Sequence, residues 1–226
     1  MREYTKWERF QNWLHYNKLW IIALAVVFWV AGSMVWNVLG IGQPKADYRI
    51  AYVGSREFDE KTVQTLENAL ASFGQDANGD GKVTVVLTQY ITGSDSSTDN
   101  MMYGYAAQME VLADITEGES TFFLLENPVD FQLSFQILAH PDGSIPAEDD
   151  FSALDKVYPW ANCPALTSLD LGDYEDKYLN ITETGEVQEL LKNLCLGRRY
   201  FYDPAQQKSP EADEAFWQTV TEGATP

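Results

Sequence analysis

The sequence predicts an α/β protein with an N-terminal transmembrane helix, an extracytoplasmic βαβαβ domain with a parallel sheet, and helical additions at the C-terminal end. Three observations lead to this prediction. Residues 19–41 contain no charged side chain. Strand-like and helix-like segments alternate from residue 48 to residue 125, which is typical of parallel sheets with crossover helices. The 226 residues carry a net charge of −19, and that charge is distributed very unevenly.

The first element is the uncharged run at 19–41. As a helix it would be about 34 Å long, enough for a bilayer core of about 30 Å. Trp20 and Trp36 stand near its two ends, where amphipathic rings meet the membrane interfaces. The alternative is a cleaved signal peptide, whose apolar core is usually shorter and ends at small residues. We therefore expect a retained anchor at 19–41.

Charge on the two sides of this run predicts its orientation. Residues 1–18 hold four basic and two acidic side chains, whereas residues 42–226 hold 11 basic and 32 acidic ones, a net charge of −21. The positive-inside rule then places the N-terminus in the cytoplasm and residues 42–226 outside the cell membrane. We expect residues 1–18 to form a juxtamembrane helix, either lying on the inner leaflet or docking on another membrane subunit.

The extracytoplasmic part begins with alternating strands and helices. The expected elements are a strand at 48–53, a helix from the Asp59 cap to Gly74, a strand at 83–91, a helix with Met102, Tyr105, Met109 and Leu112 on one face, and a strand at 121–125. Residues 83–91 are apolar on both faces, which is typical of a central strand.

The pattern weakens after residue 126. Asn127 and Pro128 resemble a cap and first helical position, opening a helix to about Ala139. Residues 141–183 are rich in Pro, Asp, Ser and Asn, and we expect a long irregular segment there. A helix is predicted from Thr184 to about Leu196, and a last one from Pro210.

One local motif indicates a metal. Residues 76–83 read DANGDGKV, which resembles the first half of a calcium-binding loop. Oxygen atoms at alternate positions converge on a hard cation, and a glycine allows the sharp turn. The expected Ca²⁺ ligands are Asp76, Asn78, Asp80, Lys82 through its carbonyl group, and Thr84. Leu87 replaces the usual final Glu, so the alternative is a tight turn with solvated acids.

The two cysteines, Cys163 and Cys195, both fall in the extracytoplasmic part. In an oxidising compartment they could form a disulfide that ties the irregular segment to the following helix. The alternative is a pair of buried free thiols.

Composition argues against several functions. The acidic balance excludes a nucleic-acid binder, because phosphate contacts need clustered Lys and Arg. His140 is the only extracytoplasmic histidine, and no serine-nucleophile motif surrounds a serine, so we expect no enzyme, with a hydrolase as the less favoured alternative. Residues 83–155 contain thirteen acids and no Lys or Arg. This stretch is either a solvated acidic face or a surface that attracts cationic ligands or a basic partner.

Two resemblances follow from these residues. The segment 13–20, WLHYNKLW, together with ADYRIAYVG at 46–54 and the loop at 76–85, resembles an uncharacterised group of single-pass membrane proteins of Gram-positive bacteria. The βαβαβ order, with Ala113-Asp114-Ile115 and Gly118 before the third strand, is similar to one lobe of the extracellular solute-binding proteins of ABC transporters. A complete two-lobed protein needs many more residues, so the resemblance implies a single lobe.

These observations predict a binding or accessory domain that is anchored in the lipid bilayer and associates with membrane transporter subunits. The alternative is a calcium-braced structural or adhesion module of the cell surface. Ligands of open parallel sheets bind beyond the carboxyl ends of the strands. The expected ligand-binding residues are therefore Gly54, Ser55, Arg56, Gly93, Ser94, Glu126 and Asn127. Arg56 is the one base among them and would favour an anionic ligand.

Overall fold

The computed structural model describes residues 6–38, 45–92, 98–178 and 181–225, and within these ranges it leaves some side chains, mostly in the first helix, undescribed. The chain divides into two compact units, Met1–Pro44 and Lys45–Pro226. The described residues of the first unit form helix α1 (Lys6–Val38). Within the described part of the chain, no helix meets the combined length and apolarity that crossing a membrane requires.

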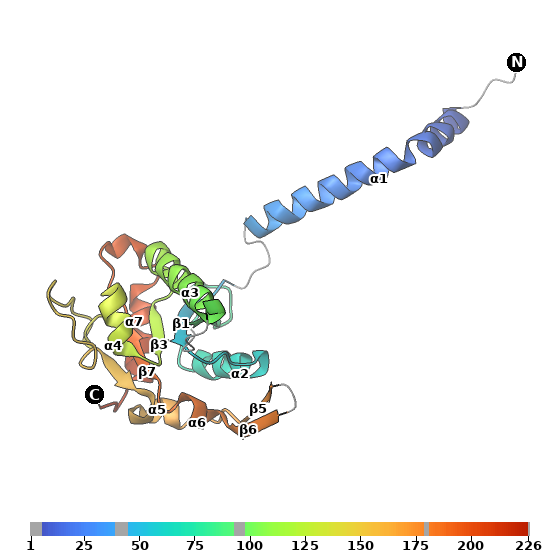
Figure 1. The fold of residues 1–226 in the computed structure, drawn as a ribbon. Coiled ribbons are helices and arrows are strands. Elements are labelled where there is room, and N and C mark those ends of the chain that lie inside the picture. The colour runs from blue at the N-terminus through green and yellow to red at the C-terminus, as the bar shows by residue number, and fades with distance from the viewer. Residues whose placement is uncertain (1–5, 39–44, 93–97, 179–180, 226) are drawn as a thin grey trace, which may run out of the picture. The chain divides into compact units, whose positions relative to one another are not determined.

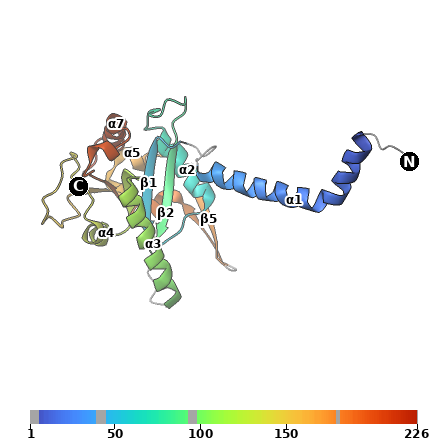
Figure 2. The same cartoon turned by 90° about the horizontal axis from the view of Figure 1, so that it is seen from above.

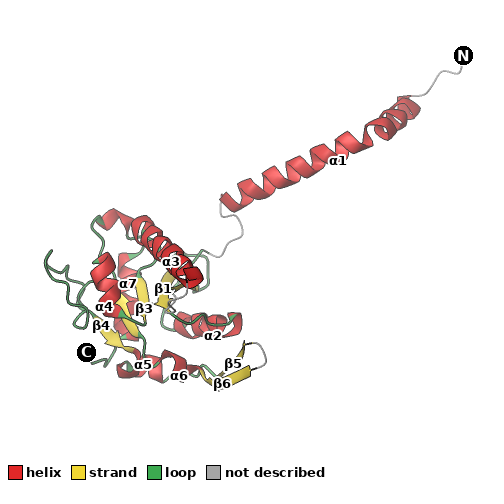
Figure 3. Cartoon of the chain, viewed as in Figure 1, coloured by secondary structure: helices red, strands yellow, loops and turns green. Residues whose placement is uncertain are grey.

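The second unit is a mixed α/β domain (Figure 1 and Figure 3). Its strands are β1 (Tyr48–Gly54), β2 (Val85–Ile91), β3 (Phe122–Leu125), β4 (Val157–Pro159), β5 (Asp173–Tyr178), β6 (Ile181–Glu186) and β7 (Cys195–Arg198). Its α-helices are α2 (Glu60–Ala71), α3 (Thr98–Glu117), α4 (Pro128–Phe135), α5 (Pro164–Thr167), α6 (Val187–Leu191) and α7 (Pro210–Val220), with 3₁₀ turns η1 (Trp160–Asn162) and η2 (Pro204–Gln206).

Five strands form the main sheet, in the order β2-β1-β3-β7-β4. β1 pairs in parallel with both β2 and β3, as the βαβαβ pattern predicts. β7 runs antiparallel to β3, and β4 runs antiparallel to β7. The sheet is therefore mixed, and the prediction of a purely parallel sheet is wrong in its C-terminal half. β5 and β6 pair separately as a two-stranded hairpin.

Helices lie on both faces of the main sheet (Figure 1 and Figure 2). Strand alternation divides the core into two layers, one on each face. Ile50 and Phe122 lie on the face covered by α2, α5, α6 and α7. Ala51 and Phe123 lie on the opposite face, together with residues of α3 and α4. Because successive side chains of a strand point to opposite faces, the apolar strands β1 and β3 need helices on both sides.

Two expectations about the first half of the domain need correction. β2 is an edge strand rather than a central one, because β1 lies between it and β3; α2 and α3 both contact β2, which explains its apolar character on both faces. On α3, Tyr105, Met109 and Leu112 are exposed, whereas Val111 is fully buried. The buried face of α3 is thus rotated from the predicted one.

The helix predicted at 184–196 is confirmed only in its middle part. Residues 181–186 form strand β6, only Val187–Leu191 is helical, and the chain re-enters the main sheet as β7. Gly197 allows this insertion, because a Cβ atom there would lie 3.0 Å from Leu138 and 3.2 Å from Val157. Pairing with β3 therefore overrides the helical spacing of the leucines. The last helix, α7, begins at Pro210 as predicted.

The irregular segment before β4 is fixed by one buried side chain. Lys156 is fully buried, and its Nζ donates to Asp150 Oδ2 at 2.9 Å and to the Ser152 carbonyl and hydroxyl oxygens at 2.7 Å. These contacts close residues 150–156 around an ammonium group. Residues 141–156 are irregular, as predicted, although they are held by a charged centre. The expectation of an irregular segment as far as residue 183 is wrong, because β4, η1, α5 and β5 lie within it.

Candidate functional site

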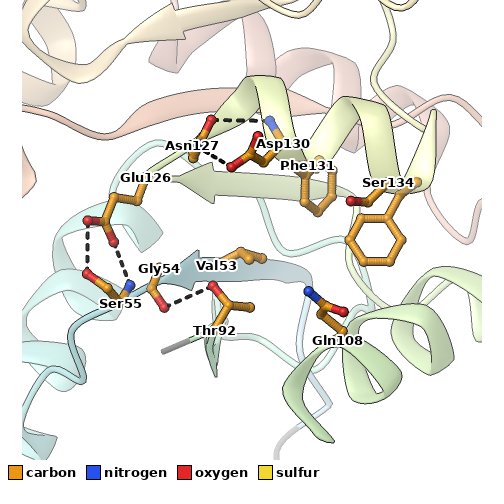
Figure 4. Close-up of a pocket in the computed structure, with 11 residues that line it drawn as sticks. Val53, Gly54, Ser55, Thr92, Gln108, Glu126, Asn127, Asp130, Phe131 and Ser134 are labelled. Atoms are coloured by element: carbon orange, nitrogen blue, oxygen red, sulfur yellow. Dashed lines mark hydrogen bonds between the residues drawn. The ribbon is translucent and has the colours of Figure 1, made fainter. Parts of the chain in front are cut away.

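A cavity of about 510 Å³ lies at the edge of the sheet where the parallel strands end (Figure 4). β1 ends at Gly54, β2 at Ile91 and β3 at Leu125. The described lining residues come from these strand ends, α3 and α4: Val53, Gly54, Ser55, Thr92, Gln108, Glu126, Asn127, Asp130, Phe131, Ser134 and Phe135. The cavity volume falls in the range of small-molecule sites, and its location is the usual one for ligands of α/β sheets.

Glu126 and Ser55 join the ends of β3 and β1 across the site. The Glu126 carboxylate accepts hydrogen bonds from the Ser55 backbone N–H and, at 2.9 Å, from the Ser55 hydroxyl group. Both residues are exposed at the cavity. This pair fixes one carboxylate at the edge of the sheet, directly after the neighbouring strands β1 and β3.

Asn127 and Asp130 form the start of α4. The Asn127 side chain accepts from the Asp130 backbone N–H at 3.2 Å and donates to the Asp130 carboxylate at 2.5 Å. Asn127 therefore caps the helix, as the sequence predicts, and positions a second carboxylate at the cavity. An acidic residue in the first turn also stabilises the positive end of the helix dipole.

Two aromatic rings form the apolar wall of the cavity. Phe131 is buried and packs 4.9 Å from Phe123 of β3 and 5.0 Å from Phe135, measured between ring centroids. Figure 4 shows Phe131 and Ser134 on α4 and Gln108 on α3, on opposite sides of the cavity. The rings give the site an apolar surface next to its polar strand ends.

The backbone at the end of β1 requires glycine. A Cβ atom on Gly54 would lie 2.2 Å from the Tyr52 hydroxyl oxygen. Tyr52 is buried, and this burial, with the nearby charge of Glu126, raises the pKa of Tyr52 to about 12. The Tyr52 phenol is therefore neutral at physiological pH, and Gly54 leaves room for it at the end of β1.

Four of the predicted ligand-binding residues line this cavity: Gly54, Ser55, Glu126 and Asn127. Gly93 and Ser94 lie outside the described residues. Arg56 does not line the cavity. Its guanidinium group lies 3.4 Å from Glu183 of β6 and 5.1 Å from the Tyr174 ring of β5, so it faces the hairpin.

Sequence reasoning missed the residues that follow the α4 cap and those on the facing elements: Val53, Thr92, Gln108, Asp130, Phe131, Ser134 and Phe135. A signal was present for α4, because residues 127, 130, 131, 134 and 135 share one helical face after a strand end. Gln108 had no such signal, because its placement depends on the packing of α3.

The predicted calcium loop is a turn whose acidic side chains accept hydrogen bonds from its own backbone. Asp76 accepts from the backbone N–H groups of Gly79 and Gly81 at 2.7 and 2.8 Å, and Asn78 and Asp80 each accept from the residue two positions later. Asp47 adds a carboxylate from before β1, accepting from Thr84 N at 2.7 Å. Lys82 is exposed. Calcium binding by this loop stays a prediction.

The disulfide predicted between Cys163 and Cys195 is not formed. Both cysteines are free, Cys163 buried and Cys195 half-buried. Burial raises the pKa of the Cys163 thiol to about 11 and also raises the pKa of Cys195. Both groups are therefore protonated thiols near neutral pH, the alternative that the sequence left open.

His140 lies beside the charged centre of the irregular segment. Its two ring nitrogens are 3.7 Å from Asp150 Oδ2 and 3.8 Å from Asp155 Oδ2, so the three side chains are close enough to share a metal ion. The ammonium group of Lys156 already contacts both carboxylates. A further cation there would be repelled by Lys156, so the group is best described as an ion-pair network.

Comparison with known proteins gave no match: no family model, curated protein or solved structure matches this chain. The proposed function therefore rests on the site and on the sequence.

Proposed function

We propose that residues 45–226 form an extracytoplasmic ligand-binding domain, anchored in the cell membrane by residues 19–41 and accessory to a membrane transporter, of which an ABC transporter is the favoured kind. The observation that carries the binding function is the cavity at the carboxyl ends of β1, β2 and β3. It combines polar side chains from strand ends with an aromatic wall, which is the usual composition of a small-molecule site.

The anchor rests on the sequence. Residues 19–41 lack charge, and the charge balance changes from +2 before them to −21 after them. The 33-residue helix α1 contains most of this run. A positive flank on one side and an acidic domain on the other support an orientation with the domain outside.

Copurification tests the accessory role. The full-length protein would be isolated from its own membrane in mild detergent, and the accompanying proteins identified by mass spectrometry. We expect permease or ATPase subunits of a transporter. Recovery of only cell-wall or unrelated membrane proteins, reproducibly, would contradict this role.

A second candidate function is a calcium-braced interaction module of the cell surface. The observation that favours it is the loop at 76–84. The carboxylates of Asp76 and Asp80, and that of Asp47 from before β1, all accept hydrogen bonds from the backbone of this loop. Thermal unfolding of the full-length protein with CaCl₂ and with EDTA separates the two candidates. Stabilisation by Ca²⁺ that disappears in Asp76→Asn, without any response to small molecules, would favour the module.

A further inference from the structure

The hydrogen bonds of the cavity indicate which kind of ligand group it can accept. The Ser55 N–H and hydroxyl groups donate to Glu126, the Asn127 amide donates to Asp130, and the Thr92 hydroxyl donates to the Gly54 carbonyl at 3.4 Å. These donors are already used within the protein. A carboxylate accepts about four hydrogen bonds, so Glu126 and Asp130 retain free acceptor capacity. Gln108 and Ser134 also line the cavity, but they are neutral and can either donate or accept, so the charged groups of the site offer only acceptors to a ligand.

The charge of the cavity points the same way. Glu126 and Asp130 are its two ionisable lining residues, and the described lining contains no Lys, Arg or His. Arg56, the nearest base in the sequence, contacts Glu183 instead. The amino end of α4 carries only about half a positive charge, and Asp130 in the first turn more than offsets it. An anionic ligand would meet net repulsion here.

The aromatic wall suits the same ligand. Phe131 and Phe135 line the same cavity as the two carboxylates. Aromatic faces attract cations through their quadrupole and also cover the apolar stem of an alkylammonium group. Neutral polyols would use the acceptors as well, but they would leave two carboxylates uncompensated.

We propose that the cavity binds a cationic nitrogen group, an alkylammonium or guanidinium, through Glu126 and Asp130, with the ligand's stem against Phe131 and Phe135. This inference rests on the proposed binding function and names the ligand class of the same site. The group could belong to a free amine or to a Lys or Arg side chain of a peptide, since the chemistry at the carboxylates is the same.

Isothermal titration calorimetry on the full-length protein in a non-ionic detergent tests the proposal. The probes are spermidine, L-arginine, glucose and citrate, each at low and physiological NaCl. We expect spermidine or arginine to bind, with affinity that falls as salt screens the carboxylates. Glu126→Gln and Asp130→Asn should each weaken binding about tenfold, the usual effect of losing a charge-assisted hydrogen bond.

Glu110→Gln is the matched control. Glu110 is an exposed carboxylate on α3 that does not line the cavity, so this variant changes net charge equally and should bind as the wild type does. Equal losses in all three variants would show only a general attraction to an acidic protein and would overturn the proposal.

The remaining outcomes separate the ligand class from the binding function. One such outcome is that glucose or citrate binds, no amine binds, and the binding is lost in Ser134→Trp, which fills the cavity. This result would refute the cationic ligand but support the binding function. The absence of binding by every probe would refute the ligand class, and the copurification result would then decide the function. A lysine-containing peptide, with its acetyl-lysine form as control, distinguishes a peptide source from a free amine.

Discussion

Replacement of Lys156 by Met should destabilise the domain strongly. The side chain is fully buried, and its ammonium group donates to Asp150 and twice to Ser152. Methionine fills the space of the aliphatic stem, so little packing is lost. What is lost is the cation: removing one partner of a fully buried ion pair costs about 3–5 kcal/mol.

The expected cost is somewhat smaller than that range. The Asp150 side chain is 27% exposed and Ser152 is also exposed, so water can replace part of the lost hydrogen bonding. The loss of a hydrogen bond to a charged group costs about 1.5–3 kcal/mol. We therefore expect a loss of about 2–4 kcal/mol in the free energy of unfolding, or roughly 5–15 °C in Tm for a domain of this size.

Urea unfolding of the full-length protein, followed by tryptophan fluorescence, measures this loss. Lys192→Met is the control, because Lys192 and Glu189 form an exposed ion pair whose side chains are 51% and 62% exposed. Such pairs contribute about 0–1 kcal/mol. Equal stabilities for Lys156→Met and Lys192→Met would refute the buried position of Lys156 and the structure of the loop around it.

Three further predictions concern α3, α7 and the acidic loop. Val111→Ala should lower the free energy of unfolding by about 1–3 kcal/mol in the same urea titrations, because Val111 is fully buried. Met109→Ala should change it by no more than about 0.5 kcal/mol, because Met109 is 56% exposed. The reverse order would mean that the face of α3 predicted from the sequence is the buried one. Burial raises the pKa of Asp213 above its ordinary value, so the folded state binds this proton more tightly than the unfolded state, and the charged form opposes folding. Stability should therefore rise as pH falls through the raised pKa toward the ordinary value of a carboxyl group, and Asp213→Asn should flatten this part of the stability profile; an unchanged profile would contradict the burial. If the loop at 76–84 binds Ca²⁺, millimolar CaCl₂ should raise the Tm of the wild type but not that of Asp76→Asn. Equal Tm values of the wild type in CaCl₂ and in EDTA would contradict calcium binding.

The parallel half of the fold could be predicted because local signals and tertiary structure agree there. Tyr48–Gly54 and Phe122–Leu125 are apolar runs bounded by clear turn residues, and Asp59 and Asn127 cap helices as their side chains predict. The right-handed crossover rule is consistent with the observed order β2-β1-β3. Since the three strands are parallel, their carboxyl ends meet at one edge of the sheet, and the cavity lies at that edge.

The antiparallel half could not be predicted, because its strands depend on distant partners. The leucines near residue 190 have helical spacing, yet Cys195–Arg198 forms a strand because β3 offers an unpaired edge. The contacts of Arg56 could not be predicted for the same reason: the hairpin that it faces is more than a hundred residues away in sequence. The acidic character of the cavity depends on the helix α4, which brings Asp130 to the same cavity as Glu126.

The central claim is that the cavity at the carboxyl ends of the parallel strands binds a ligand. The most direct test compares the Tm of the full-length wild type and of Ser134→Trp with amine, sugar and carboxylate probes at millimolar concentration. A true ligand at a hundred times its Kd stabilises the folded state by about 2.7 kcal/mol. We expect an amine to raise the Tm of the wild type and to leave the Tm of Ser134→Trp unchanged. Equal shifts in both proteins would contradict it, since the ligand would then bind elsewhere.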